Sequence, residues 1–438
     1  MLFASTRAAL VPVTFEEAVF RGLAQDGGLY HPMEETDLRP FFLSLTESHS
    51  FVDVAAAMTA RLFPENFTPD DAREIAERAF SFSPSMVHNV DGLHLLELFH
   101  GPSCAFKDFG ASFLATVMES FLRRSDRRAI ILTATSGDTG SAVARAFHNR
   151  RNIEVVILYP SGRVSPLQEK QLTTCGGNVT ALEVHGSFDD CQKMAKDAFI
   201  DRDLMARLPL TSANSINLGR LIPQSFYYVY AFAQLKSRLN DELIFCVPSG
   251  NYGNLTAGVL AWRWGLPVNG FVAAANRNDV VPEYLASGLY QPRPSVHTPS
   301  NAMDVGNPSN FERLRAIFHD NWNGMRSMIW GESVSDRETV DTMRRYYERH
   351  GLFLDPHTAV GVCAAERRFD RELAKAVDVV ILSTAHPAKF SEVVREATGA
   401  VPPIPEELAK VLTLEKRAVQ VENSFEALRE FLLTRYST

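Results

Sequence analysis

The spacing of apolar positions changes near residue 90, and this change separates two kinds of predicted structure. Before it, apolar residues recur at the spacing of amphipathic helices, so residues 1–85 are predicted to be mostly helical. A capping box at residues 14–17 opens the first helix, and the turn residues Asp26-Gly27-Gly28 are predicted to end it. The Thr-Pro-Asp-Asp run at residues 68–71 predicts the start of another helix.

From about residue 90, short runs rich in β-branched residues alternate with helical stretches. We predict strands at residues 130–133, 154–158, 243–247, 271–275 and 379–382. A capping box at residues 335–338 starts a long helix that runs to about His350 and stops at Gly351. Continuous apolar strands separated by helices indicate an α/β fold with a parallel sheet buried on both faces. Ligands bind such sheets at the carboxyl ends of the strands.

One lysine lies in the apolar segment HGPSCAFKDFG. Lys107 stands close to Phe106 and Phe109. A lysine in apolar surroundings loses its charge more readily, and a neutral amine is what a Schiff base requires. Alone the observation is weak, because most of the 44 Lys and Arg are solvated surface charges. Cys104 is an alternative catalytic group, with His100 as its nearby candidate base.

Two Gly-rich loops each follow a predicted strand and precede a helix, at residues 136–140 and 249–254. Glycine lets the backbone approach an oxyanion closely, and a helix N-terminus adds a favourable dipole. Each loop could equally be a turn without a ligand, with Ser136 or Asp138 as the N-cap in the first. Lys107 and the two loops together suggest pyridoxal phosphate, with its aldehyde on the lysine and its phosphate in a loop.

Two further segments carry candidate chemistry. Arg220 suits a phosphate because its guanidinium makes bidentate contacts, although a surface arginine at a helix start is the alternative. Thr384 follows the last predicted strand, where its hydroxyl could face a pyridine nitrogen. His386 and Lys389 could be acid–base groups or structural residues, and His357 lies in a predicted turn without an assigned function.

Composition narrows the class of protein. With 438 residues, two or three domains are expected, and 45% apolar and 22% charged residues are ordinary values. A net charge of −8 argues against nucleic acid as a partner but not against a small cationic pocket. No segment reaches the roughly 20 apolar residues of a membrane span. The five scattered cysteines have neither CxxC nor metal-ligand spacing, so we expect no metal site and a cytoplasmic location.

Together these segments resemble the threonine synthase family, of pyridoxal-phosphate fold type II, in its shorter microbial and fungal form. The resemblance runs almost end to end. It is carried, in this order, by STR, DGGLY, HGPSCAFKDFG, TATSGDTG, SANSIN, PSGNYGN, NAMDVGNPSN and TAHPAKF. It implies parallel sheets flanked by helices in two core domains, after a mostly helical N-terminal domain. The implied division is 1–88, a core of 89–400 with a smaller mobile subdomain at about 109–212, and a C-terminal helical segment of 401–438.

The resemblance also implies an activity, that of a carbon–oxygen lyase in the last step of threonine biosynthesis. O-phospho-L-homoserine and water would give L-threonine and phosphate by β,γ-elimination and replacement, with Lys107 forming the Schiff base and moving protons. The implied cofactor-binding residues are Lys107, Asp138, Gly250, Asn251, Tyr252, Gly253, Asn254 and Thr384. The implied substrate-binding residues are Ser136, Thr139, Ser215, Asn217 and Arg220. Asp138 replaces the asparagine of the wider fold, so it is either protonated or directed away from the cofactor phenolate.

Three other functions compete with this interpretation. A related phospho-lyase would eliminate phosphate but release 2-oxobutyrate and ammonia instead of threonine. A serine or threonine dehydratase would leave Ser215 and Arg220 without an anionic group to bind. A metabolite-binding relative without catalysis would not be expected to keep Lys107. Monomer and homodimer are both open, and closure of the domains over the substrate is expected because the intermediates must be shielded from water.

Overall fold

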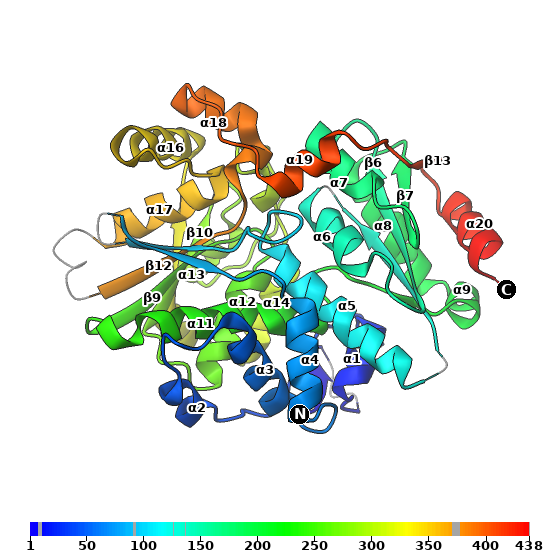
Figure 1. Ribbon diagram of the computed structural model, residues 1–438, viewed down its shortest axis with the longest axis horizontal. Coiled ribbons are helices and arrows are strands. Elements are labelled where there is room, and N and C mark those ends of the chain that lie inside the picture. Colours follow the sequence, from blue (N-terminus) through cyan, green and yellow to red (C-terminus); the bar gives the residue numbers. More distant parts are fainter. Residues whose placement is uncertain (8–10, 91–92, 126, 136, 370–376, 438) are drawn as a thin grey trace.

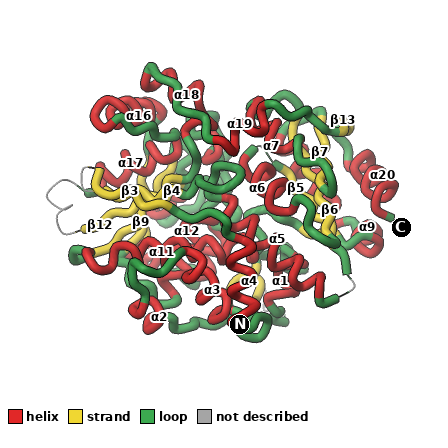
Figure 2. The backbone as a smooth tube through the Cα atoms, viewed as in Figure 1, coloured by secondary structure: helices red, strands yellow, loops and turns green. Residues whose placement is uncertain are grey.

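A computed structural model describes residues 1–7, 11–90, 93–125, 127–135, 137–369 and 377–437. The molecule is built around two separate twisted sheets with helices on both faces of each, and a layer of N-terminal helices covers one side (Figures 1 and 2). The predicted α/β class with parallel sheets in two core regions is confirmed.

The N-terminal layer combines helices with a small antiparallel sheet. Its helices are α1 (Phe15–Arg21), α2 (Arg39–Ser44), α3 (Phe51–Leu62) and α4 (Pro69–Ala79), and its strands are β1 (Phe3–Ser5) and β2 (Tyr30–Pro32). The capping box predicted at Thr14 is present, and the helix predicted to start at residues 68–71 does so, with Thr68 forming a further capping box. The predicted end of α1 at Asp26 is wrong. Gly22, at φ 70°, stops the helix earlier, and the Asp26 carboxylate instead accepts hydrogen bonds from Ser5 Oγ, at 2.8 Å, and from the Gly28 N–H.

The larger sheet has six strands in the order β11-β10-β9-β12-β4-β3. Their bounds are β3 (Ser85–Val90), β4 (Leu93–Glu97), β9 (Glu242–Pro248), β10 (Gly270–Ala275), β11 (Ile329–Ser333) and β12 (Val377–Ser383). The three strands predicted here are β9, β10 and β12, in the middle of the sheet. β3 runs antiparallel to β4, so the sheet is not wholly parallel as expected. α17 (Pro356–Arg368) packs on one face with α16 (Asp336–His350) outside it, while α11 (Ser225–Leu235) and α12 (Gly253–Arg263) lie on the other (Figure 1).

The smaller sheet has five parallel strands in the order β13-β7-β6-β5-β8. Their bounds are β5 (Ala129–Ala134), β6 (Ile153–Pro160), β7 (Val179–Val184), β8 (Leu210–Thr211) and β13 (Val419–Val421). Successive residues of β5 enter different cores. Ile131 joins the core that includes α5 (Lys107–Arg123), whereas Ile130 and Leu132 pack with α8 (Phe188–Ile200) and α20 (Phe425–Tyr436). This period of two is what buries the sheet on both faces.

The C-terminal segment crosses from the larger sheet to the smaller one (Figure 1). α18 (Ser391–Thr398) packs near α16, and α19 (Glu406–Leu412) packs on α7 (Pro166–Thr173). Residues 401–438 were expected to be helical only. They also contain a strand, because β13 pairs in parallel with β7. The remaining helices are α6 (Asp138–Phe147), α9 (Arg202–Arg207), α10 (Leu218–Leu221), α13 (Val280–Ser287), α14 (Phe311–Ile317) and α15 (Trp322–Met328).

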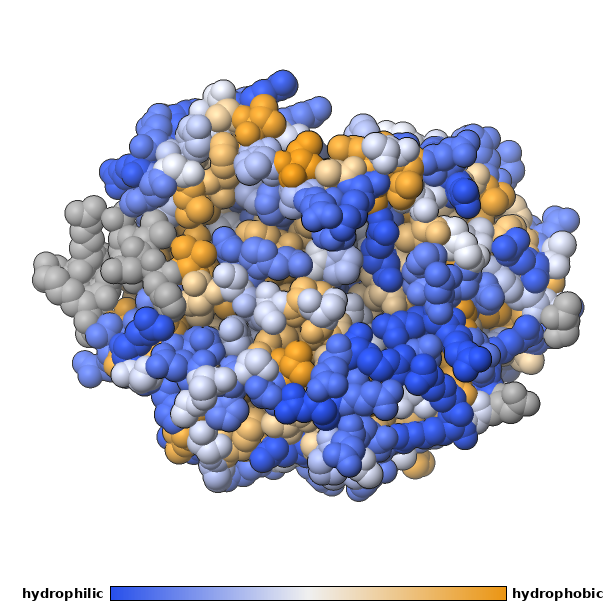
Figure 3. Space-filling view, viewed as in Figure 1, coloured by the Kyte–Doolittle hydropathy of each residue, from blue (hydrophilic) through white to orange (hydrophobic). Residues whose placement is uncertain are grey.

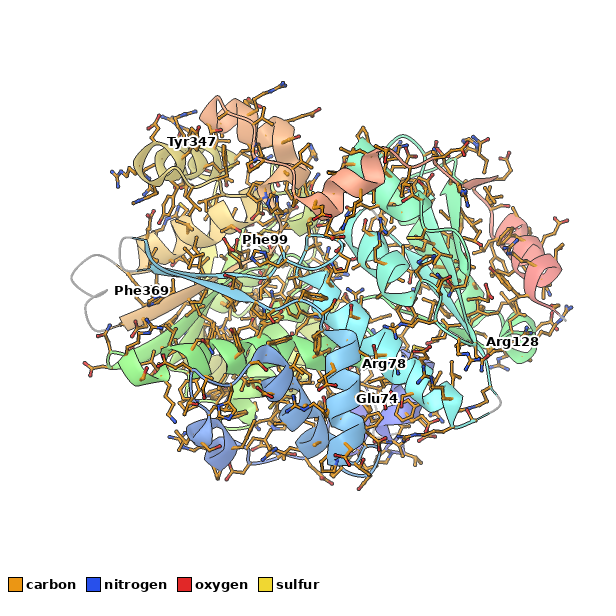
Figure 4. All side chains as sticks on the ribbon, viewed as in Figure 1. Glu74, Arg78, Phe99, Arg128, Tyr347 and Phe369 are labelled. Atoms are coloured by element: carbon orange, nitrogen blue, oxygen red, sulfur yellow. The ribbon has the colours of Figure 1, made fainter. Side chains whose placement is uncertain are left out.

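A charged cluster ties the N-terminal layer to the smaller sheet. Glu74 and Arg78 lie side by side on α4 (Figure 4), and Arg78 extends to form a hydrogen-bonded ion pair with the buried Glu119 of α5. Arg150, beside the smaller sheet, donates to the same Glu119 at 3.0 Å.

The face drawn in Figure 3 is mostly hydrophilic, with hydrophobic residues in scattered groups. In the described part of the chain no helix is long and apolar enough to span a membrane.

Candidate active site

A cavity of about 490 Å³ lies between the two sheets, beyond the carboxyl ends of β9 and β12 and beside the start of α6. This is the position at which parallel sheets bind ligands. The predicted site residues that line it are Lys107, Asp138, Thr139, Ser215, Arg220, Gly250, Asn251, Tyr252, Gly253, Asn254 and Thr384. Ser136 lies outside the described residues. Asn217 is not in the cavity wall.

Lys107 is the first residue of α5 and projects into this cavity. Burial lowers the pKa of its amine to about 8. The negative charge of Asp138 raises this pKa, whereas the positive charges of Arg220 and Lys389 lower it further. Its Nζ lies 5.9 Å from the centre of the Phe106 ring. A lysine with this pKa is partly neutral near physiological pH, so it can act as a nucleophile and can exchange protons.

The loop between β9 and α12 brings the backbone of a helix N-terminus to the cavity. A Cβ on Gly250 would lie 2.7 Å from the Cα of Met303, so only glycine fits there. Tyr252 has a left-handed backbone, at φ 59°, which turns the chain into α12. The first N–H groups of a helix have no acceptor within the helix, and its dipole favours negative charge at that end.

Side chains of the same loop add two unused donors. Asn254 Oδ1 accepts hydrogen bonds from the hydroxyl groups of Tyr227 and Tyr228, at 2.6 and 2.8 Å. These bonds fix the amide so that Nδ2 is the free end. Asn254 Nδ2 and the Tyr252 hydroxyl are both buried without a hydrogen-bond partner among the described residues. Buried polar groups are normally hydrogen-bonded, so these two donors fit an anionic ligand such as the cofactor phosphate.

Arg220 supplies a second positive end to the cavity. It is buried in α10, where Nη1 donates to the Ala213 carbonyl at 2.7 Å and Nε has no partner among the described residues. Burial lowers its pKa to about 10, with Asp108 acting in the opposite direction. A buried guanidinium without a carboxylate is costly unless a ligand compensates its charge. Ser215, which accepts a hydrogen bond from Asn251 at 3.1 Å, lines the same cavity.

Asn217 positions α10 instead of lining the cavity. Its Oδ1 accepts from the Gly219 N–H, and its Nδ2 donates to the backbone carbonyls of Val19 and Ser212, at 2.9 and 2.8 Å. Both amide hydrogens and the amide oxygen are therefore bonded within the protein. Its effect on the site is indirect, because it is the N-cap of the helix that carries Arg220.

Asp138 is ionised and does not stand alone. Its Oδ1 lies 2.8 Å from Lys389 Nζ and accepts a hydrogen bond from Gln168 at 3.0 Å. Burial opposes ionisation of this carboxyl, but Lys389 and then Lys107 hold its pKa well below the usual range. Of the two alternatives raised by the sequence, the carboxylate is thus directed toward Lys389 and is not protonated.

Three parts of the site region had no settled role in the sequence: His357, residues 301–310, and His386, which was either an acid–base group or a structural residue. His357 lines it, with Nδ1 2.7 Å from Asp355 Oδ1 and Nε2 accepting from the Ala302 N–H at 3.3 Å. Within residues 301–310, quoted for the resemblance only, residues 302–307 and 309 line one wall. His386 is turned away and caps the next turn through the Ala388 N–H, at 3.1 Å. The capping bond of His386 and the contact of His357 with Asp355 are local, but the approach of His357 to Ala302 depends on distant segments and has no local sequence signal.

Cys104 is not suited to catalysis. Burial raises the pKa of its thiol to about 12, with the positive charge of Lys389 opposing the shift. It packs in a small apolar cluster with Leu167, Ala388 and Leu408. A thiol that stays protonated is a poor nucleophile, so Cys104 is a packing residue.

Comparison with known proteins identifies the family. Residues 83–385 match the family described as pyridoxal-phosphate dependent enzyme, residues 2–80 match threonine synthase N terminus, and residues 358–432 match threonine synthase, C-terminal. The chain is 41% identical over 432 residues to the threonine synthase of Escherichia coli strain K12, and the match covers 96% of both chains. The chain belongs to the threonine synthase family.

Solved threonine synthases have the same fold. The pyridoxal-phosphate-bound threonine synthase of Brucella melitensis superposes with a TM-score of 0.92 at 34% identity, covering 99% of this chain and 98% of that one. The yeast threonine synthase gives 0.91 at 34% identity, with the same coverage. Membership of the threonine synthase family makes this a pyridoxal-phosphate dependent enzyme of fold type II, as the resemblance predicted.

Proposed function

We propose that this threonine synthase converts O-phospho-L-homoserine and water to L-threonine and phosphate, the last step of threonine biosynthesis. The observation that carries the proposal is the buried guanidinium of Arg220, which lies in the same cavity as Lys107, has an Nε without a hydrogen-bond partner and forms no ion pair among the described residues. A cofactor phosphate bound at residues 250–254 would not neutralise the charge of the Arg220 guanidinium. A second anion in the cavity, the phosphate of the substrate, would neutralise it.

The residues of the cavity fit pyridoxal phosphate. In the proposed arrangement, Lys107 binds its aldehyde, the start of α12 with Asn254 Nδ2 binds its phosphate, and the Thr384 hydroxyl faces its ring nitrogen. When bound, the cofactor supplies an electron sink that stabilises negative charge at the reacting carbons of the substrate. Asp138 can lie beside the ring because Lys389 balances its charge.

The protein's own groups then orient the substrate and move protons. Arg220 and Ser215 bind the phosphate that leaves, which fixes the γ carbon in the cavity. Thr139, at the start of α6, binds the substrate carboxylate together with Ser136, whose role rests on the resemblance alone. With the cofactor bound, the Lys107 amine would be the group that transfers protons at Cα and Cβ of the substrate, a task that suits a pKa of about 8.

We further propose the division into residues 1–88, a catalytic core at 89–400 with a smaller mobile subdomain at about 109–212, and a C-terminal segment at 401–438. The separate sheets on either side of the cavity support this division and closure between them. A cytoplasmic location is part of the proposal, supported by five cysteines that are all free. Monomer and homodimer remain alternatives.

One assay separates the proposed reaction from its rivals. The cofactor-loaded protein is incubated with O-phospho-L-homoserine, and phosphate, threonine and 2-oxobutyrate are quantified together. Threonine equal to phosphate supports the proposal. Phosphate with mainly 2-oxobutyrate would make the protein a phospho-lyase, and absence of phosphate release would overturn the assignment of Arg220 and of the substrate. O-phospho-L-serine, which is one carbon shorter, is the control substrate and should release no phosphate.

A further inference from the structure

A single buried lysine connects the two sides of the cavity. Lys389 lies in the 3₁₀ helix η5 (Pro387–Phe390), just after β12 of the larger sheet. Its Nζ donates to the Ser103 carbonyl at 2.6 Å and lies 2.8 Å from Asp138 Oδ1. Ser103 precedes α5 and lies on the side of the larger sheet, whereas Asp138 begins α6, which packs on β6 of the smaller sheet. The ammonium group therefore bridges the two halves.

Helix α7 reinforces the same junction from the side of the smaller sheet. Gln168 donates to Asp138 Oδ1 at 3.0 Å, and Gln171 donates to the Ser103 carbonyl at 3.2 Å. The two glutamines are three residues apart, so they lie on one face of the helix. Each of the two atoms that Lys389 holds thus has a second donor from α7. These hydrogen bonds form one connected buried network, and bonds in such a network polarise and strengthen one another.

The network meets both chemical walls of the cavity. Asp138 is followed by Thr139, in the proposed carboxylate-binding wall, and Ser103 lies four residues before Lys107. Asp108, the residue after Lys107, accepts from the Ser103 N–H at 2.8 Å. A shift of Ser103 therefore moves the backbone that carries the lysine, and a shift of Asp138 moves the start of α6.

We propose that Lys389 is a positioning residue that holds the start of α6 over Lys107 by clamping Asp138 to the Ser103 carbonyl. Its effect on turnover rests on the proposed function, but its structural effect does not. A plain buried ion pair would behave differently. Removal of one partner leaves an unpaired buried charge and destabilises the fold, and removal of both relieves that cost. Only a clamp leaves a loss that the double substitution does not repair.

The test compares Lys389→Met, Lys389→Arg, Asp138→Asn and the double variant Asp138→Asn/Lys389→Met. In cofactor-free protein, amide hydrogen exchange over residues 138–147 should become about tenfold faster in Lys389→Met, while exchange over α12 stays unchanged. In cofactor-loaded protein, kcat/KM for O-phospho-L-homoserine should fall about tenfold or more, with the Kd for pyridoxal phosphate within about threefold of the native value. Lys389→Arg keeps the charge and should recover part of both losses.

The double variant distinguishes a clamp from a structural ion pair. It should recover the melting temperature lost in Lys389→Met but keep fast exchange in α6 and low kcat/KM. Recovery of all three would overturn the proposal, as would native exchange and native kcat/KM in Lys389→Met. If the single variant does not fold, the double variant and Lys389→Arg carry the same comparison.

A matched control is Lys416→Met. Like Lys389, Lys416 is held by two oxygen groups, here the carboxylates of Glu169 at 2.7 Å and Glu183 at 2.8 Å, but neither of its partners lines the cavity. It should cost some stability and leave both α6 exchange and kcat/KM at native values. If the native enzyme fails to turn over O-phospho-L-homoserine, the proposed function falls. The hydrogen-exchange comparison still decides the clamp.

Discussion

Gly110 packs directly against the backbone of Arg220. A Cβ at position 110 would lie 2.6 Å from the Arg220 carbonyl oxygen, a separation that no side chain tolerates. Gly110 is one turn into the helix that begins with Lys107. The absence of a side chain at this point therefore sets how closely the two cationic groups of the cavity approach each other.

Replacement of Gly110 by alanine should separate these two groups. The overpacked contact should lower the free energy of unfolding by about 1–3 kcal/mol. It should also raise KM for O-phospho-L-homoserine, because Arg220 is displaced relative to Lys107, while the Kd for pyridoxal phosphate stays near its native value. Steady-state kinetics well below the melting temperature, with a cofactor titration, test this. A less stable protein with an unchanged KM would show that the contact serves packing only.

Arg220 should be important for substrate binding but not for stability. Arg220→Met removes a charge-assisted contact with the substrate phosphate, so KM should rise about 10–100-fold. The ligand-free variant should lose little or no stability, because the buried cation that is removed forms no ion pair among the described residues and only the Ala213 carbonyl loses a donor. The measurements are KM, the Kd for pyridoxal phosphate and the melting temperature of the cofactor-free protein.

Arg313 provides the matched control for that prediction. It is also fully buried, but it donates to the Tyr30 carbonyl at 2.7 Å, to Asn310 Oδ1 at 2.6 Å and to the Ile216 carbonyl at 2.5 Å. Arg313→Met leaves these acceptors unsatisfied and should destabilise the fold by several kcal/mol. If both variants lost the same stability, the unpaired state of Arg220 would not mark a ligand site.

The parts of the site that could be predicted from sequence are local. Residues 249–254 follow a strand and open a helix, and Lys107 carries its apolar neighbours in the same segment, so a short window contains the relevant chemistry. Three central strands of the larger sheet, β9, β10 and β12, were predictable for the same reason, because each is a largely continuous apolar run, whereas β3, β4 and β11 were not predicted.

The parts that could not be predicted depend on distant segments. Asp138 is ionised because Lys389, far along the chain, folds against it. Asn217 has the residue type and sequence position of a ligand-binding amide. Its Nδ2 instead donates to the backbone carbonyls of Val19 and Ser212. β13 is three residues at a sheet edge with two exposed side chains, too short and polar for a strand pattern. The sequence pattern does not place the end of α1, because Gly22 competes with the stronger turn residues 26–28 that follow it.

Thr384 should control the protonation of the cofactor ring. A neutral hydroxyl does not favour a protonated pyridine nitrogen, whereas a carboxylate does. Thr384→Asp should therefore shift the absorption band of the cofactor-loaded enzyme and lower the ratio of threonine to 2-oxobutyrate. Thr384→Ser retains the hydroxyl and serves as the control, with native spectrum and products. An unchanged spectrum and product ratio in Thr384→Asp would remove this residue from the ring nitrogen.

Lys107 should make the stability of the cofactor-free protein depend on pH. Burial lowers its pKa to about 8, below the ordinary value of 10.5, so the unfolded chain binds more protons between these values and stability rises with pH across that window. Below pH 8 the folded state carries the full cost of the buried ammonium. Lys107→Met should thus be more stable than the native protein by about 1–3 kcal/mol at pH 7, and the difference should vanish by about pH 10.5. Urea unfolding at both pH values tests this. Lys416→Met is the control, because this variant should not gain stability at either pH. If the difference in the free energy of unfolding between Lys107→Met and the native protein were independent of pH, the lowered pKa of Lys107 would be contradicted.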